Sequence, residues 1–198
     1  MAHRALTAII LAFAAAGGLT EGAEAQAMVR PAEPLDRPAI SRAANALFQR
    51  TCVAHFADRT AMEQVLRDSG LRLAPPEAAA QLARNNPGRV WRGSDKSRPM
   101  AVVTREAGVL CQVMAPHADI ETSVAAFRRS AEELRRAGMT VTPVRDEPAQ
   151  LGGQPGQQVF FRIGPEAGGI LMALSVATAR PGGLALLMTA SHTAPEPR

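Results

Sequence analysis

Residues 119–138, DIETSVAAFRRSAEELRRAG, carry the strongest secondary-structure signal of the chain. Asp119 suits a helix N-cap, and Gly138 suits a C-terminal stop. Between them, apolar residues recur at alternating intervals of four and three, which is the spacing of one helix face: Ile120, Val124, Phe127, Ala131 and Leu134. We predict an amphipathic helix over residues 119–137 that packs its apolar face against the rest of the domain.

The opposite side of this helix carries Arg128, Arg129, Glu132, Glu133, Arg135 and Arg136. Arg128 lies four residues before Glu132, and Arg129 lies four before Glu133, so opposite charges can pair along the helix surface. We therefore interpret this side as a solvated face whose charges neutralise one another, rather than as a binding patch.

Strand patterns flank the helix on both sides. Upstream, residues 100–104 and 109–114 are rich in β-forming side chains, and the short link between them predicts a hairpin. Residues 89–92 are a further short strand candidate. A polar loop with glycine and proline is expected over residues 146–156. Downstream of the helix, four strands are expected at residues 139–144, 157–163, 170–178 and 184–191.

Helix signals precede the strands. One helix is expected to begin near Pro38, and a second near Thr60, because Thr60 and Glu63 match a capping box. An alanine-rich stretch at residues 77–84 predicts a third. The fold class is thus α+β, with N-terminal helices followed by a mostly antiparallel sheet of about six or seven strands and one long helix packed across it.

The first 27 residues have the pattern of a secretory signal peptide: a basic start, an apolar run, a glycine break and small residues suited to cleavage. Residues 28–38 hold three prolines and are expected to form an extended leader. A single domain should then cover residues 39–192, followed by a disordered tail at 193–198. Residues 180–183, RPGG, divide the apolar C-terminal stretch into pieces too short to span a bilayer as helices.

Both cysteines, Cys52 and Cys111, lie in the mature part of the chain. An exported protein matures in an oxidising compartment, and two cysteines allow only one intramolecular pairing. We therefore expect a disulfide between Cys52 and Cys111. A reactive thiol with a resolving partner is the alternative, but redox cysteines usually lie close together in sequence.

Composition and charge limit the classes of partner. The chain is 46% hydrophobic and 20% charged, which is typical of a folded domain and not of a disordered one. Cleavage of the leader would leave 21 basic and 16 acidic residues, a net charge of +5. An exported protein rarely meets nucleic acid, so we expect no nucleic-acid partner. A periplasmic protein or an anionic envelope component remains as a partner class.

Catalytic and metal-binding motifs are not recognisable in the sequence. His55, His117 and His192 form no known zinc-ligand pattern, and no glycine-rich phosphate loop or nucleophile elbow is present. We expect no metal and no cofactor. The ring of His55 or His117 with a nearby aspartate is the one arrangement that would support a hydrolase.

Trp91 is the only tryptophan of the chain, and it lies between Arg89 and Arg92. On a strand, the side chains of Arg89 and Trp91 share one face. If a binding surface exists, we expect it to include these two residues, with the indole as a stacking platform beside a cation. The alternative is that Trp91 is a core aromatic.

The order of several short motifs resembles a family of small, uncharacterised proteobacterial periplasmic proteins and lipoproteins. These motifs are Phe48-x-x-x-Cys52-Val53, the segment 66–71, Pro87-Gly88-Arg89-Val90-Trp91 and Cys111-Gln112-Val113. The resemblance covers most of residues 40–190 and implies an exported protein with one cysteine pair, but it implies no activity. No cysteine lies near the cleavage site, which differs from the lipoprotein members and favours a freely soluble form.

Two classes of function therefore stay open. The first is a periplasmic or secreted, non-enzymatic binding or accessory module. The second is a small envelope-acting hydrolase that uses a His–carboxylate pair. A pocket with such a pair would favour the enzyme, and an apolar surface patch would favour the binding module.

Overall fold

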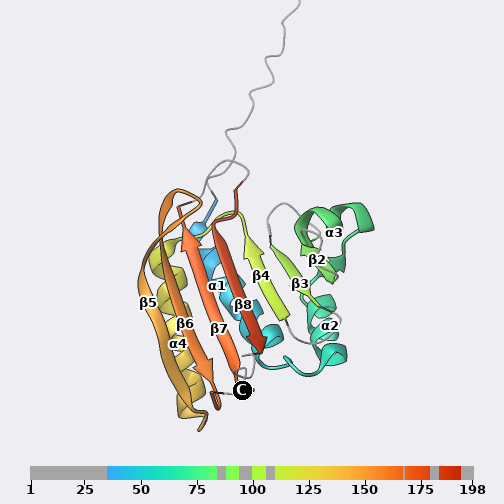
Figure 1. The fold of residues 1–198 in the computed structure, drawn as a ribbon. Coiled ribbons are helices and arrows are strands. Elements are labelled where there is room, and N and C mark those ends of the chain that lie inside the picture. Colours follow the sequence, from blue (N-terminus) through green and yellow to red (C-terminus); the bar gives the residue numbers. More distant parts are fainter. Residues whose placement is uncertain are drawn as a thin grey trace, which may run out of the picture. The chain divides into compact units, whose positions relative to one another are not determined.

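The computed structural model describes residues 35–83, 88–93, 100–105, 110–166, 168–178 and 183–192. These residues form helices followed by an antiparallel sheet, with a long helix packed on the sheet, so the predicted α+β class is confirmed (Figure 1). The expected signal peptide at 1–27 and tail at 193–198 lie outside the described residues.

The helices begin and end where the chain supplies caps. Their bounds are α1 (Arg37–Phe48), the π-helical η1 (Gln49–Val53), α2 (Arg59–Asp68), α3 (Pro76–Ala83) and α4 (Ile120–Arg136). The Asp119 carboxylate accepts a hydrogen bond of 2.8 Å from the backbone N–H of Thr122, and Gly138 ends α4 with a φ of 87°. The long helix therefore lies where its pattern predicts it.

The start of α2 differs from the expected capping box. Asp58, not Thr60, is the N-cap, and its carboxylate accepts a hydrogen bond of 3.0 Å from the N–H of Ala61. Aspartate caps at least as well as threonine, so the earlier residue begins the helix. Glu63 is consequently not needed as a cap, and its carboxylate contacts arginines instead.

The described strands form one antiparallel sheet in the order β1-β2-β3-β4-β8-β7-β6-β5, one strand more than the upper expectation. The additional strand β1, Leu71–Leu73, is only three residues long and carries no clear pattern. The other bounds are β2 (Arg89–Gly93), β3 (Ala101–Thr104), β4 (Leu110–Ala115), β5 (Val141–Leu151), β6 (Gln154–Ile163), β7 (Ile170–Ala177) and β8 (Leu186–His192).

Two meanders meet in the middle of the sheet. The first runs from β2 through β3 to β4, and the second runs from β5 through β6 and β7 to β8. The first begins beside the edge strand β1, and the second begins at the edge strand β5. Both end at the centre, where β4 and β8 pair antiparallel from Leu110↔Ser191 to Ala115↔Leu186. In the chain, α1, α2, β1 and α3 precede the first meander, and α4 precedes the second.

The predicted polar loop at residues 146–156 is wrong, because most of it is a β-hairpin. β5 extends to Leu151, and β6 begins at Gln154. The two residues between them, Gly152 and Gly153, both have positive φ values (59° and 75°), as a tight hairpin turn requires. Cross-strand pairing overrides the polar composition, since Asp146 accepts a hydrogen bond from the Gln157 amide at 2.9 Å.

Strand β5 forms one edge of the described sheet, and most of its residues are exposed. It contains Pro143 and Pro148, and its register shifts between Pro143 and Arg145. Proline lacks an N–H group and is tolerated in edge strands, which explains why this long strand lies at the periphery.

The core lies between the sheet and the pair α1 and α4, which pack against each other and lie behind the sheet in Figure 1. Phe127 of α4 joins the layers, because its ring centroid lies 6.0 Å from that of Phe48 in α1 and 5.9 Å from that of Phe161 in β6. Alternate residues of each central strand point into this core, as the period of a strand dictates.

Polar contacts fix α1 against α4. The Ser41 hydroxyl accepts a hydrogen bond of 2.9 Å from the backbone N–H of Asp119, and it lies 2.9 Å from the Ser123 hydroxyl. The Asn45 amide donates to the Ser130 hydroxyl at 3.1 Å. Ser41, Ser123 and Ser130 are buried, and their small side chains allow the two helices to approach closely.

The charges of α4 pair differently from the helical spacing prediction. Arg128 donates two hydrogen bonds of 2.8 Å to the carboxylate of Asp146 on β5 instead of pairing with Glu132. Glu132 pairs with Arg135. Bidentate geometry favours the contact between Arg128 and Asp146, and it ties the long helix to the edge strand. Hydrogen bonds from Arg128, followed by one from Gln157, hold the pKa of Asp146 below its ordinary value.

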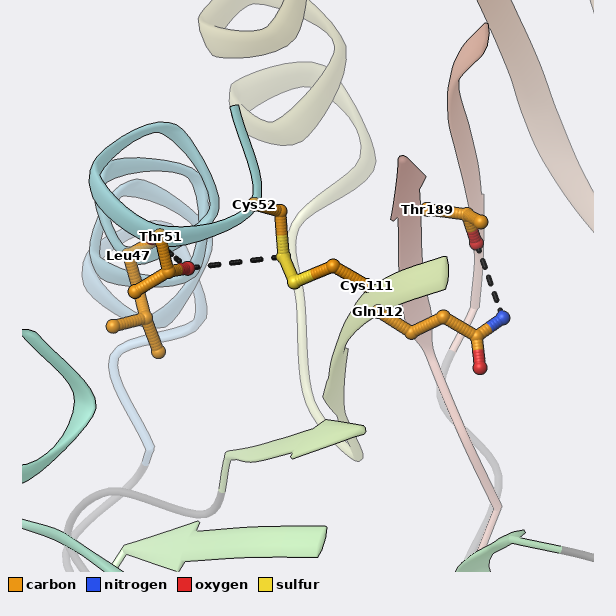
Figure 2. Close-up of a disulfide and its surroundings, with 6 residues drawn as sticks. All are labelled: Leu47, Thr51, Cys52, Cys111, Gln112 and Thr189. Atoms are coloured by element: carbon orange, nitrogen blue, oxygen red, sulfur yellow. Dashed lines mark hydrogen bonds between the residues drawn. A yellow bond between two sulfur atoms is a disulfide. The ribbon is translucent and has the colours of Figure 1, made fainter. Parts of the chain in front are cut away.

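The expected disulfide is confirmed between Cys52 in η1 and Cys111 in β4, with 5.3 Å between their Cα atoms (Figure 2). Both residues are almost completely buried. Thr51 beside the bond donates a hydrogen bond of 2.6 Å to the backbone oxygen of Leu47, which satisfies its buried hydroxyl. The bond thus links the N-terminal helices to the centre of the sheet.

Replacing both cysteines by alanine should lower the free energy of unfolding by about 4 kcal/mol, because the bond closes a loop with a sequence separation of 59 residues. For a domain of this size, the melting temperature should fall by roughly 10 °C. Thermal melts of the oxidised protein, the reduced protein and the double variant test this. Equal melting temperatures for all three would contradict a stabilising role.

The Arg128–Asp146 contact should make stability depend on acid pH. The folded-state pKa of Asp146 is lowered, so the contribution is fully present above the ordinary pKa of 3.8 and is lost as pH falls through the lower folded value. Melts between neutral pH and pH values below 3.8 should show the difference between the wild type and Asp146→Asn shrinking with acid. Arg128→Gln should reduce the same pH dependence, and unchanged profiles in both variants would contradict the assignment.

Candidate functional site

The histidines do not form the arrangement that a hydrolase would need. Among the described residues, His55 and His117 make no hydrogen bond or ion pair with a carboxylate. Asp58 and Asp119, their nearest aspartates in sequence, cap α2 and α4 instead. His192 at the end of β8 contacts the ring of Phe56 edge-on, with 4.9 Å between ring centroids.

Trp91 and Arg89 point to the side of β2 that faces α2. Only 4% of Trp91 is exposed, and Arg67 of α2 lies over its ring with 5.9 Å to the centroid. Arg89 donates hydrogen bonds of 3.0 Å to both carboxylate oxygens of Glu63. The strand alternation is as expected, but the buried indole matches the alternative of a core aromatic.

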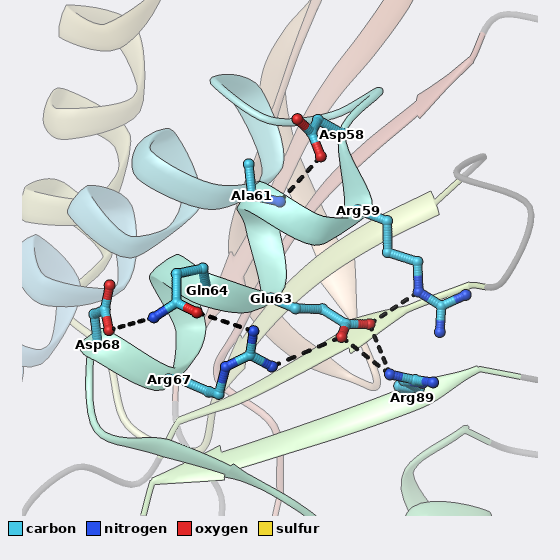
Figure 3. A network of polar contacts seen from close by, with 8 residues as sticks. All are labelled: Asp58, Arg59, Ala61, Glu63, Gln64, Arg67, Asp68 and Arg89. Atoms are coloured by element: carbon cyan, nitrogen blue, oxygen red, sulfur yellow. Dashed lines mark hydrogen bonds and ion pairs between the residues drawn. The ribbon is translucent and has the colours of Figure 1, made fainter.

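Glu63 is surrounded by three arginines, which we call the Glu63 cluster: Arg59, Arg67 and Arg89 (Figure 3). The Glu63 side chain is 11% exposed, whereas the arginine side chains are 34–48% exposed. A nearly buried carboxylate needs such partners, because an unpaired charge there would be costly. The cluster joins α2 to β2, and we assign it a structural role.

A different surface, on the other side of the central strands, is not covered by either α1 or α4 (Figure 1). The side chains of the four central strands that alternate with the core residues point to the other side of the sheet, which we call the outer face. In Figure 1, α1 and α4 lie behind these strands. The outer-face residues are Leu110, Gln112, Met114, Gln158, Phe160, Arg162, Leu171, Ala173, Ser175, Leu187, Thr189 and Ser191, and all are half-buried.

Toward β2 the same side of the sheet is closed. Val90 and Val103 are opposite each other on neighbouring strands, and both are buried. Helix α3 packs against β2. The outer face therefore consists of β4, β8, β7 and β6, the strands on either side of the junction between the two meanders.

The outer face combines apolar side chains with polar groups that pair among themselves. The Gln112 amide donates to the Thr189 hydroxyl at 3.2 Å, on the side of β4 opposite to the disulfide (Figure 2). The Gln158 amide donates to the Ser175 hydroxyl at 3.4 Å. Since these groups satisfy one another, the face offers apolar contact more than free hydrogen-bonding groups.

Positive charge lies at one margin of the outer face. Arg162 belongs to the face, and Arg145 of β5 lies opposite Phe160 in the register. The guanidinium carbon of Arg145 is 5.3 Å from the centroid of the Phe160 ring. Arg145 also pairs with Glu147 at 3.3 Å, and Arg162 pairs with Glu166 at 3.2 Å. Both acidic side chains are exposed, by 58% and 77%.

Sequence reasoning missed this face. Its apolar members are interleaved with core residues, as in Phe160-Phe161, so a strand buried on both sides and a strand with one open apolar side look alike. The signal that distinguishes them is the topology, because both helices that could cover the sheet pack on the same side.

Comparison with known proteins assigns no family. No family model matches the chain, and no curated protein sequence matches it. In the described part of the chain, no group of three or more histidine, cysteine, aspartate or glutamate side chains is arranged to hold a metal ion. Among the described helices, none combines the length and apolar character needed to cross a lipid bilayer.

Trp91→Ala should lower the free energy of unfolding by roughly 3–5 kcal/mol, because it removes a large buried side chain and leaves a cavity. Leu73→Ala is the matched control, since Leu73 lies opposite Trp91 on β1 but is 53% exposed. Thermal and denaturant melts measure both changes. A melting temperature of Trp91→Ala close to that of the control would contradict the core assignment.

Proposed function

We propose that the chain is an exported, periplasmic or secreted protein that acts as a non-enzymatic binding or accessory module, with the outer face as its binding surface. The observation that carries this proposal is the composition of that face. An antiparallel sheet that faces water normally presents polar side chains there. Here six of the twelve outer-face residues are apolar, among them leucines, a methionine and a phenylalanine, and apolar patches on a surface are typical of interaction sites.

Export is supported by two independent observations. The first 27 residues have the pattern of a signal peptide. The buried disulfide between Cys52 and Cys111 is consistent with folding in an oxidising, extracytoplasmic compartment. The resemblance to small periplasmic proteins points in the same direction.

Binding is favoured over catalysis by the chemistry of the outer face. The outer-face residues include one arginine, Arg162, and no histidine or carboxylate of the kind that usually serves as a general base. Its amides and hydroxyls are occupied by one another, as in the pair Gln112 and Thr189. Such a face can hold a partner by apolar contact and charge, and the partner classes are a periplasmic protein or an anionic envelope component.

Leu187→Gln should abolish retention of the natural partner, because it places a polar amide among the apolar side chains of the outer face, opposite Met114. Residues 28–198 would be incubated with an envelope extract, repurified and analysed by native mass spectrometry. Met139→Gln is the matched control, since Met139 is 45% exposed and lies outside the outer face. The wild type and the control should retain the same added mass, and Leu187→Gln should lose it.

Two results would contradict the proposal. Equal retention by Leu187→Gln, with an unchanged melting temperature, would place binding elsewhere on the protein. Catalytic conversion of an extract component by the purified wild type would instead support the hydrolase alternative.

A further inference from the structure

We propose that the outer face binds a single-chain anionic amphiphile, with its acidic headgroup held by Arg145 and Arg162 and its acyl chain laid across β7 and β8 toward β4. This inference rests on the proposed function, because it names the chemical class of the partner for the same surface. The headgroup chemistry is that of a phosphate, as in a lysophospholipid.

The size of the face favours a small occupant. Four strands spaced about 4.8 Å apart, each with about five residues of about 3.3 Å rise, give an open area of roughly 300 Å². A stable protein partner or a second copy of the chain would need about 800 Å² on each side. An acyl chain needs only a narrow apolar strip, and the face is large enough for that.

The apolar strip runs across the strands. The register places Phe160 opposite Ala173 and places Leu187 opposite Met114. Leu171 precedes Ala173 by two residues on the same side of β7. Thr189 lies opposite Ala173, and Ser175 lies opposite Leu187, so the apolar side chains form a diagonal whose step from β7 to β8 passes between these two polar residues. An acyl chain on this diagonal would contact Phe160, Ala173, Leu187 and Met114 in turn. The hydrogen-bonded pair of Gln112 and Thr189 can remain intact beside it.

The charge at the margin selects an anionic headgroup. Arg145 and Arg162 lie on either side of Phe160, one across the strand pair and one two residues along β6. Arg145 also donates a hydrogen bond of 2.9 Å to the side-chain oxygen of Gln158. The carboxylate partners of the two arginines, Glu147 and Glu166, are exposed, and ion pairs of this kind contribute little to stability. A phosphate can therefore replace them at small cost and accept hydrogen bonds from both guanidinium groups.

Arg162 supplies a second, independent observation. Among the described residues its Nε atom is buried without a hydrogen-bond partner, as is the Nε1 atom of Trp91, and the Arg162 side chain is 25% exposed. A buried donor without an acceptor is unfavourable. If this guanidinium rotates toward an anionic oxygen above Phe160, its Nε–H can donate a hydrogen bond to that oxygen. Binding of an anionic headgroup at this end of the outer face would therefore satisfy the buried donor.

The test is a titration of the disulfide-bonded protein, residues 28–198, with dodecyl phosphate below its micelle concentration. Backbone amide shifts in NMR spectra report the site, and calorimetry reports the affinity. Shifts should cluster on β6, β7, β8 and β4. Dodecyl maltoside, which is neutral, and inorganic phosphate, which has no chain, should each bind about tenfold or more weakly than dodecyl phosphate.

Variants separate the two halves of the site. The double variant Arg145→Gln with Arg162→Gln should bind dodecyl phosphate with about tenfold lower affinity and bind dodecyl maltoside with unchanged affinity. Leu187→Gln should lower the affinity for both amphiphiles. Arg129→Gln, which removes an exposed arginine on α4, is the matched control and should change neither.

Three outcomes overturn the inference. These are equal affinity for the neutral and anionic amphiphiles, equal affinity in the double arginine variant, and amide shifts confined to residues outside the outer face. If the envelope extract yields a protein partner whose binding depends on Leu187 while dodecyl phosphate does not bind, the proposed binding function is supported and the proposed amphiphile ligand is wrong. If neither depends on Leu187, both proposals fail.

Discussion

Strand β4 is the element on which the other parts of the fold converge. It pairs with β3 on one side and with β8 on the other, so it carries the contact between the two meanders. Through Cys111 it is bonded covalently to Cys52 and thereby to the N-terminal helices. Its inward residues lie under α1, and its outward residues belong to the outer face. A displacement of this one strand would alter the core, the disulfide and the open face together.

The sequence predicted those features that depend on local periodicity or on simple pairing rules. Helix α4 has caps and an uninterrupted apolar face, and the two cysteines had one possible intramolecular partner each. The sequence did not predict features that depend on contacts between segments far apart in the chain. The stretch 146–156 looks like a loop until β6 pairs with it, and Arg128 prefers Asp146 on another element over a helical neighbour. The burial of Trp91 agrees with the core interpretation of the sequence, whereas its contact with Arg67 was not predictable because it requires α2 to lie over β2.

The two sides of the sheet illustrate a division of physical tasks. The covered side contains the rings of Phe48, Phe127 and Phe161, the disulfide and the buried serines between α1 and α4, all with satisfied contacts. The other side contains residues whose burial is incomplete, and it meets the arginines of β5 and β6 at its margin. The residues that define a candidate site are thus not the residues that hold the fold together, so the outer face can vary without loss of the core.

The composition of β5 has a consequence for self-association. An edge strand with free N–H and C=O groups can add a strand of another molecule and so begin an extended aggregate. In β5, Pro143 and Pro148 remove two donors, the register shift bends the strand, and charged residues separate the prolines. At the opposite edge, β1 offers only three residues. Neither described edge is therefore a good template for the addition of a strand from another copy of the chain.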